Sequence, residues 1–211
     1  MPGSAYYNIA KQTAEWLSVV NECCINTSSK SISDKLDEIV LKADHELVSF
    51  DIVSLYTNVP VLEAIDVCAD LLYSGEYKKP PVDKETFIEL LKICSENVIM
   101  LIHDGIYRQK DGLAMGSPPA PMLANGWLST YDPIIKEDAM IYERYVDDIL
   151  RDIHKDKIDD TLEKINTLNP EFLNSPSNTN LTIRSRFLTW KYTELLTDSS
   201  PLGLPSRPIR V

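Results

Sequence analysis

The sequence contains few of the residues that bind transition metals or form disulfide bonds. Its 211 residues include three histidines and four cysteines, and no two cysteines have the C-x-x-C spacing of a zinc site. Cys23 and Cys24 are adjacent, whereas Cys68 and Cys94 stand alone. We therefore expect no zinc site and interpret the cysteines as reduced, mostly buried thiols.

The chain also lacks a long apolar run. No stretch approaches the roughly 20 apolar residues that a membrane-spanning helix needs. The first residues have neither the basic start nor the apolar centre of a signal peptide. We therefore expect an intracellular protein, nuclear or cytoplasmic, that is neither secreted nor membrane-bound.

Positive charge is scarce as well. Lys and Arg number 21 against 32 Asp and Glu, which gives a formal net charge of −11. This balance argues against a non-specific nucleic-acid binder, which normally carries a basic stripe. Residues 132–163 hold 11 acidic and 5 basic side chains. Such a concentration of carboxylates suits a divalent-cation site, and it equally suits a solvated acidic helix.

The composition is that of a globular protein, with 44% hydrophobic and 25% charged residues. Its length allows one good core and a small appended lobe. Apolar spacing predicts an amphipathic helix over 9–20, and Asp83 is expected to cap a helix that follows it. The pattern divides the chain into an N-terminal helical segment, 1–46, a central segment, 47–170, and an irregular tail, 171–211. Within that tail, residues 181–192 have room for a strand or two.

Two adjacent carboxylates, Asp147 and Asp148, lie between apolar and aromatic strand-forming residues in the heptapeptide 144–150. The neighbours favour burial in a sheet, whereas the carboxylates require water, a cation or a partner. A tight hairpin that presents the carboxylates at its tip satisfies both demands. From this heptapeptide alone, a surface hairpin with an acidic turn is as good an interpretation as a functional site.

A second carboxylate, Asp51, lies inside the apolar strand predicted over 47–53. An unpaired buried carboxylate is costly, so Asp51 should lie near the strand end and face a cleft or a cation. The chain continues through Tyr56 to Asn58. We expect Asn58 to cap a helix whose first turn holds Pro60.

Glycines mark the next two features. Asp104-Gly105 is expected to supply the positive φ angles of a two-residue turn in a hairpin over 98–109. A Gly-rich loop follows at 112–121, in which Ser117-Pro118 predicts the start of a helix that runs to about Thr130. Such a loop can receive a phosphate or the edge of a nucleotide, although most loops of this kind are only turns.

The order of these features is more informative than any one of them. Asp51, the Gly-rich loop and the acidic hairpin follow one another in a strand–helix–helix–hairpin chain that can bring Asp51 onto the strand beside Asp147. Two carboxylates on adjacent strands can hold two divalent cations roughly 3.5–4 Å apart, as in phosphoryl and nucleotidyl transfer. We predict an α+β fold in which a small antiparallel sheet has helices packed on one face, with extra N-terminal helices.

Three segments in this order, 50–60, 112–118 and 144–148, resemble motifs A, B and C of reverse transcriptases. The amino-acid sequences of these motifs are most similar to those of the Penelope-like retroelements, and the resemblance covers about residues 3–170. It implies a palm-centred fragment of an RNA-directed DNA polymerase, in which 47–170 is the palm and 1–46 is a remnant of the junction between fingers and palm. The implied partners are an RNA template, a DNA primer and a deoxynucleoside triphosphate.

The resemblance also implies the metal site. Asp51 and Asp147 would ligate two Mg²⁺ ions, for which Mn²⁺ can substitute. One ion would activate the primer 3′-hydroxyl, and the other would neutralise the triphosphate and the leaving pyrophosphate. Asp148 would support this catalytic metal site as a further carboxylate.

The substrate-binding residues follow from the same resemblance. Tyr56 falls at the family's sugar-gate position, where an aromatic ring blocks the 2′-hydroxyl of a ribonucleotide. Gly116 and Ser117 would pack against the incoming nucleotide and the template, and Tyr145 would lie near the primer terminus. From the residues alone, an ordinary core tyrosine is the alternative interpretation of Tyr56, and Asn58 is interpreted mainly as a structural helix cap.

The sequence departs from the family in three respects. The basic fingers region and the thumb are not evident, Gly126 interrupts the motif B helix, and 171–211 lacks the family's apolar strand. We therefore expect little polymerase activity from the isolated chain and leave open whether it is an enzyme. The alternatives are a non-catalytic retroelement remnant or binding module and, less favoured, an unrelated two-metal phosphodiesterase or cyclase on a similar palm.

Overall fold

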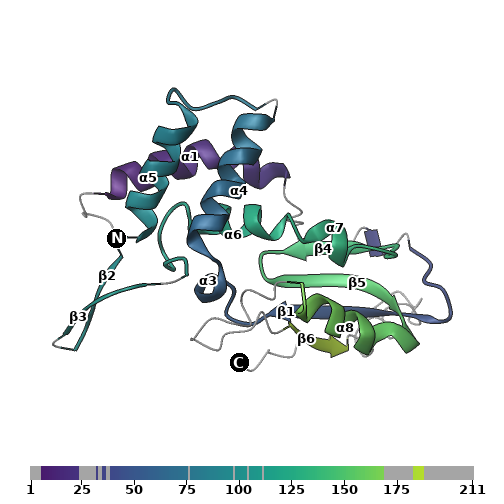
Figure 1. Cartoon of the computed structure of the whole chain (residues 1–211). Coiled ribbons are helices and arrows are strands. Elements are labelled where there is room, and N and C mark those ends of the chain that lie inside the picture. The colour runs from purple at the N-terminus through teal and green to yellow at the C-terminus, as the bar shows by residue number, and fades with distance from the viewer. Residues whose placement is uncertain are drawn as a thin grey trace, which may run out of the picture.

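The computed structural model describes residues 6–23, 32, 35–36, 39–75, 77–96, 98–103, 105–110, 112–168 and 183–187. It combines helices with a four-stranded antiparallel sheet and a separate two-stranded hairpin, so the predicted α+β fold is confirmed (Figure 1). The helices are α1 (Tyr7–Cys23), α3 (Leu55–Asn58), α4 (Val61–Ser74), α5 (Lys84–Glu96), α6 (Ala120–Leu128), α7 (Asp132–Ile135) and α8 (Ile158–Asn166). The strands are β1 (His45–Ile52), β2 (Ile99–Ile102), β3 (Gly105–Arg108), β4 (Tyr142–Tyr145), β5 (Asp148–His154) and β6 (Ile183–Phe187).

The sheet has the order β4-β5-β1-β6, which places β1 between β5 and β6. Along β1, Val48, Phe50 and Ile52 are buried, and the residues between them are partly exposed. One face of the strand therefore packs into the core, while the alternate residues, including Asp51, lie on the other face. Strand β6 falls within the predicted irregular tail and pairs with β1, and the rest of 171–211 lies outside the described residues.

The helical layer is packed closely where α4 meets α6. Cys68 on α4 is fully buried and faces the α6 backbone, with the Cys68 Sγ 3.8 Å from the Met122 carbonyl. A Cβ added at Gly126 would overlap this sulfur. Gly126 therefore allows α4 and α6 to approach each other, which explains a glycine in mid-helix despite its low helix propensity.

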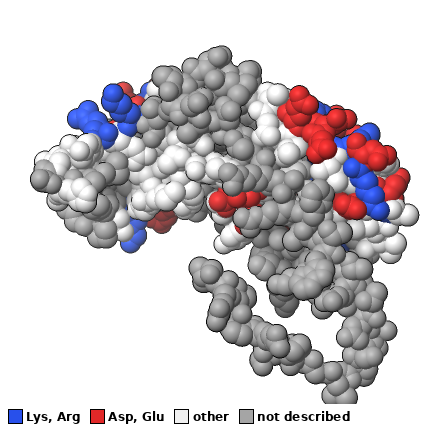
Figure 2. Space-filling view, turned by 90° about the horizontal axis from the view of Figure 1, so that it is seen from below, with Lys and Arg blue, Asp and Glu red and all other residues white. Residues whose placement is uncertain are grey.

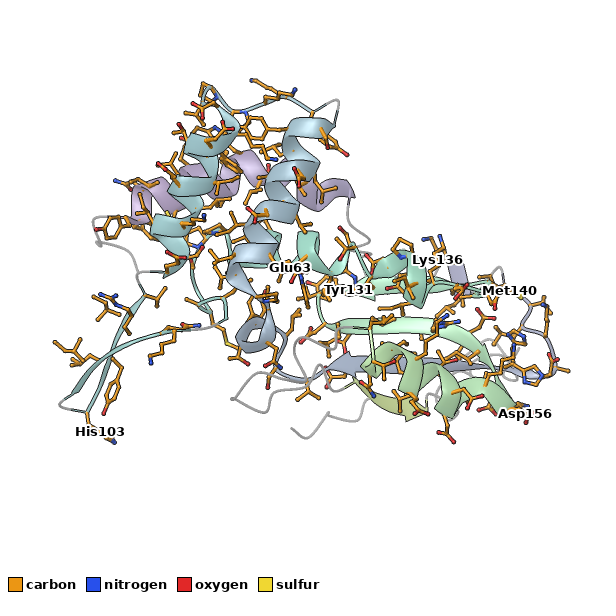
Figure 3. The ribbon with its side chains drawn as sticks, viewed as in Figure 1. Glu63, His103, Tyr131, Lys136, Met140 and Asp156 are labelled. Atoms are coloured by element: carbon orange, nitrogen blue, oxygen red, sulfur yellow. The ribbon has the colours of Figure 1, made fainter. Side chains whose placement is uncertain are left out.

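A polar contact completes the same junction. The buried Trp127 indole donates a hydrogen bond of 3.0 Å to the carboxylate of Glu63, which is labelled where α4 passes α6 in Figure 3. The indole N–H needs such a partner because Trp127 is fully buried. Apolar packing, the Cys68 contact and this partly buried hydrogen bond thus join the two helices.

Most predicted elements are present. The helix over 9–20, the strand over 47–53 and the hairpin over 98–109 correspond to α1, β1 and β2–β3. Asp83 caps α5 as predicted, since its carboxylate accepts the Thr86 amide at 2.8 Å, and this contact lowers the pKa of Asp83. Cys68 and Cys94 are buried free thiols, whereas Cys24 and the side chain of Cys23 lie outside the described residues.

Three local predictions were wrong by a few residues. Asn58 ends α3 and does not cap α4, whose N-cap is Pro60; its side-chain amide donates instead to the Val53 carbonyl at 3.0 Å. In the β2–β3 hairpin Ile102 pairs with Gly105, and a positive φ of 54° is found at His103 and not at Gly105, while Asp104 lies outside the described residues. Helix α6 begins at Ala120.

The β2–β3 hairpin projects away from the body of the molecule, with His103 at its tip (Figure 3). Within the part of the chain that the structure describes, no helix is both long enough and apolar enough to cross a membrane.

The α4–α6 junction yields a stability prediction. Gly126→Ala should lower the free energy of unfolding by about 1–3 kcal/mol, because the added methyl group overpacks the contact with Cys68. Cys68→Ala removes the sulfur, so Gly126→Ala should cost less in that background. Urea denaturation of the four members of this double-mutant cycle measures the coupling. Equal costs of Gly126→Ala in both backgrounds would contradict the close approach.

Candidate active site

The carboxylates that the sequence analysis selected meet at one end of the sheet. In the antiparallel register of β1 and β5, Asp51 is the direct partner of Asp148. Asp147 lies in the two-residue turn between β4 and β5, and its carbonyl accepts the Ile52 amide at 3.0 Å. Asp148 is exposed, while Asp51 and Asp147 are partly buried. Asp51 thus lies directly across from Asp148, and Asp147 adjoins this pair.

The backbone on both sides of this site is strained. Val146, the first residue of the β4–β5 turn, has a φ of 55°, and Ser54, just after β1, has a φ of 54°. A positive φ is unfavourable for any residue with a Cβ and especially for a β-branched one such as Val146. Strain of this kind persists only where the surrounding contacts hold it, and it is concentrated at functional sites.

Tyr56 on α3 lies next to the acidic turn. Burial raises the pKa of the Tyr56 phenol, and the negative charge of Asp147 raises it further. The Tyr56 phenol therefore lies within electrostatic reach of the Asp147 carboxylate. The structure therefore brings the predicted sugar-gate residue and one of the predicted metal ligands together.

The Gly-rich loop is fastened to α3 at its first residues. The Leu113 amide donates to the Tyr56 carbonyl at 2.6 Å, and the Gln109 side chain donates to the Gly112 carbonyl at 3.1 Å. Gly112 has a φ of 76°, and a Cβ there would come within 2.6 Å of the Thr57 carbonyl oxygen. The loop can lie against α3 only because this residue is a glycine.

The later residues of the loop are less constrained. Gly116 has a φ of 92° and open space around it, and the Ser117 amide donates to the Ala114 carbonyl at 3.0 Å. Met115, which precedes Gly116, is 75% exposed. The hydrogen bonds thus anchor the Gly112 end of the loop beside Tyr56, while Gly116 is exposed and Ser117 is partly buried.

Tyr145 borders a shallow pocket on the sheet face that carries Asp148. Tyr145 is 55% exposed. The pocket measures about 260 Å³ and is lined by Ile32, Ser49, Glu143, Tyr145, Asp148, Ile149 and Leu150. The carboxylate of Glu143 in its wall forms an ion pair with Lys35. The exposed tyrosine ring and the exposed Asp148 are therefore available to a ligand on the same face.

The three aspartates supply the hard oxygen ligands that Mg²⁺ and Mn²⁺ prefer. Among the described residues, no group of three or more His, Cys, Asp or Glu side chains is arranged to hold a metal ion. Mg²⁺ is commonly bound by one or two carboxylates and completes its shell with waters and substrate phosphates. The facing carboxylates of Asp51 and Asp148, with Asp147 beside them, fit that mode of binding.

Acidic side chains extend well beyond the site. On the face drawn in Figure 2, red Asp and Glu side chains gather toward the side of the molecule that carries the four-stranded sheet and α8, with Lys and Arg between them. This distribution agrees with the acidic excess of residues 132–163 in the sequence.

Two residues that support the site were not singled out from the sequence. Asp132 on α7 and Asn125 on α6 are both buried, and both bond to the guanidinium of Arg144, just before the acidic turn. They lie 12 and 19 residues from Arg144 in the chain. No local pattern reveals such a contact, although a polar residue in a helix as apolar as α6 indicates a buried polar partner.

No protein-family model matches the sequence, and no curated protein matches it. Solved structures do resemble the fold. Telomerase from Candida albicans, in complex with a TWJ fragment of telomeric RNA, aligns with a TM-score of 0.58 at 13% identity over 87% of this chain and 35% of the telomerase. Apo telomerase from Candida tropicalis aligns with a TM-score of 0.56 at 10% identity over 85% of this chain and 36% of that one.

A second Candida tropicalis structure, in complex with a TWJ fragment of telomeric RNA, has a TM-score of 0.57 at 11% identity. The alignment covers 85% of this chain and 33% of that telomerase. At such identities the likeness shows the fold alone, which this chain shares with part of these telomerases. The chain spans about a third of the length of these telomerases.

The two loop glycines allow a matched test of the loop's attachment. Gly116→Ala should cost about 1–2 kcal/mol of stability, because only its positive φ opposes a side chain. Gly112→Ala should cost more, on the order of 3 kcal/mol, because its methyl group also overlaps the Thr57 backbone. Chemical denaturation measures both, and equal losses would contradict the contact between loop and α3.

The proximity of Tyr56 and Asp147 predicts a titration effect. Asp147→Asn should lower the pKa of Tyr56, because it removes a negative charge that disfavours the phenolate. NMR titration of ¹³C-labelled tyrosine measures the shift. Asp83→Asn is the matched control, since Asp83 raises the pKa of Tyr73 and should leave Tyr56 unchanged. An unaltered Tyr56 pKa in Asp147→Asn would show that the two groups are apart.

Proposed function

We propose that this chain is the palm of a template-directed nucleotidyltransferase that synthesises DNA on an RNA template. The observation that carries the proposal is the joining of the three motif-like segments: the register of β1 and β5 sets Asp51 against Asp148, and the Gly-rich loop bonds to Tyr56 beside Asp147. The reverse-transcriptase-like fold, similar to part of telomerase, supports the same reaction.

Each residue has a role in this proposal. Asp51, Asp147 and Asp148 hold Mg²⁺, which supplies activation of the primer 3′-hydroxyl and neutralisation of the triphosphate charge when it is bound. Tyr56, fixed beside Asp147 by burial and by the loop, orients the sugar of the incoming nucleotide and excludes a 2′-hydroxyl. Tyr145 contacts the primer end on the pocket side of Asp148, and Gly116 with Ser117 borders the nucleotide and the template.

The partners follow from the reaction. An RNA template, a DNA primer and a deoxynucleoside triphosphate are the proposed ligands, and two of the similar telomerase structures contain RNA. The amino-acid sequences of the three motifs support a Penelope-like retroelement as the source of the domain. The acidic surface of the chain gives little attraction for phosphates, so cations must offset much of the repulsion.

A primer-extension assay tests the proposal. The full chain is incubated with an RNA template annealed to a DNA primer, deoxynucleotides and Mg²⁺ or Mn²⁺. Asp147→Asn and Asp51→Asn should each lower the rate by roughly 10²- to 10³-fold, the scale of removing one electrostatic contact to a transition state. Asp156→Asn is the control, because this exposed carboxylate lies at the opposite end of the sheet (Figure 3).

The outcomes separate the candidate functions. Extension that depends on Asp51 and Asp147 but not on Asp156 supports the proposal. Extension that survives Asp147→Asn would place the active site elsewhere. Metal-dependent hydrolysis or cyclisation of nucleotides without a primer would indicate a phosphodiesterase or cyclase. No nucleotide addition by the wild-type chain, with template binding retained, would indicate a non-catalytic nucleic-acid-binding module.

A further inference from the structure

The guanidinium of Arg144 lies at the centre of a buried polar network directly behind the acidic turn. Arg144 is 1% exposed and Asp132 is 5% exposed. The Arg144 Nε donates to Asp132 Oδ1 at 2.8 Å, and its Nη2 donates to Asp132 Oδ2 at 2.8 Å. This is the two-pronged geometry in which a guanidinium and a carboxylate bind each other most strongly.

The remaining donors of Arg144 reach α6 and the turn itself. Its Nη1 donates to the Asn125 side-chain oxygen at 3.0 Å and to the Val146 carbonyl at 3.2 Å, and its Nη2 approaches the Asn125 carbonyl at 3.5 Å. These contacts, with the two to Asp132, occupy all five N–H donors of the guanidinium. A lysine, with three donors at one point, cannot make this set of contacts.

Tyr142 extends the network. Its hydroxyl donates to Asp132 Oδ1 at 2.6 Å. Burial and the negative charge of Asp132 raise the pKa of Tyr142, so the hydroxyl keeps its proton and remains a donor. Asp132 therefore accepts hydrogen bonds from two residues of β4, Tyr142 and Arg144.

The network reaches the acidic turn at the Val146 carbonyl. Val146 has a φ of 55°, which the isolated chain disfavours, and the next residue is Asp147. On the other side of the turn, the Asp147 carbonyl accepts the Ile52 amide. Two hydrogen bonds, one from Arg144 and one from β1, thus hold the strained turn in place.

We propose that Arg144 is a positioning residue whose bonds to Asp132, Asn125 and Val146 let α6 and α7 determine where the β4–β5 turn presents Asp147. An effect of Arg144 on catalysis rests on the proposed function, whereas its role in holding the turn in place does not. A buried ion pair is a poor source of net stability, since apolar residues of similar volume often stabilise as well or better. The role of this network is therefore better explained by control of the geometry of the β4–β5 turn than by net stability.

Three variants of the full chain test the inference. Arg144→Lys keeps the charge and loses the five-donor geometry. The triple variant Arg144→Met, Asp132→Leu and Tyr142→Phe replaces the pair with apolar side chains, which preserves folding while it frees the Val146 carbonyl. Arg151→Lys is the matched control, because Arg151 is also buried and donates to the Ile135 and Glu137 carbonyls.

The first readout is amide hydrogen exchange, which does not depend on activity. The Ile52 amide, which bonds to Asp147, should exchange at least about 10-fold faster in Arg144→Lys and in the triple variant. The Lys155 amide, which bonds to the Asp44 carbonyl at 2.9 Å at the other end of the sheet, is the internal reference. Arg151→Lys should leave the ratio of the two rates unchanged.

The second readout is the rate of primer extension per folded molecule. In Arg144→Lys and in the triple variant, kcat should fall about 10- to 100-fold, as it does when residues that orient metal ligands are replaced. Arg151→Lys should keep the wild-type kcat, even if it lowers stability.

The two readouts test the positioning role and the proposed function separately. Wild-type protection of Ile52 in a folded triple variant would overturn the positioning role. A wild-type chain that extends no primer would refute the proposed function, and the exchange experiment would still decide whether Arg144 holds the turn. Faster Ile52 exchange with an unchanged kcat would overturn the inference that the turn geometry serves catalysis.

Discussion

The antiparallel register of β1 and β5 determines where the candidate carboxylates lie. It runs from His45 opposite His154 at one end of the pair to Asp51 opposite Asp148 at the other. Because side chains alternate between the faces of a strand, a slip of one residue would turn Asp51 into the core and Phe50 out of it. Burial of Val48, Phe50 and Ile52 therefore fixes the register and, with it, the meeting of the two carboxylates.

The helical layer contributes a second constraint at the same place. The sheet alone cannot hold Val146 at a positive φ, since a β-branched residue avoids that region. The pair of Arg144 and Asp132 links this turn to α7, and the close contact of Gly112 with Thr57 links the Gly-rich loop to α3. Strain in the backbone of the site is thus balanced by contacts from elements far away in the chain.

The arrangement of the carboxylates explains how the acidic charge of the chain would act at the site. Carboxylates that face each other across two strands repel one another unless a cation or a proton lies between them. A site that combines Asp51, Asp147 and Asp148 is therefore suited to divalent cations, and the surrounding acidic surface strengthens the local attraction for them. The same field opposes the approach of a nucleic acid without such cations.

Much of the fold and of the candidate site could be predicted from local pattern. Runs of strand-forming residues predicted β1 and the acidic hairpin, helical spacing predicted α1, and the Asp83 cap predicted the start of α5. Local pattern also singled out Asp51, Asp147 and Asp148, because aspartates among strand-forming residues are conspicuous, whereas Tyr56, Gly116, Ser117 and Tyr145 were predicted from the resemblance to reverse transcriptases. These features depend on neighbours within a few residues, which a sequence displays directly.

Only the tertiary structure decided how these pieces combine. Asn58 turned back to Val53 and did not cap α4, because the end of β1 and α3 form one compact turn. Gly126, which interrupts the helix pattern, proved to be the point where α6 meets Cys68. Asp132 and Asn125 joined Arg144 from two other helices. The sequence by itself thus determined the elements and the chemistry of the carboxylates, whereas packing between distant segments determined their partners and geometry, because such contacts leave no local pattern in the chain.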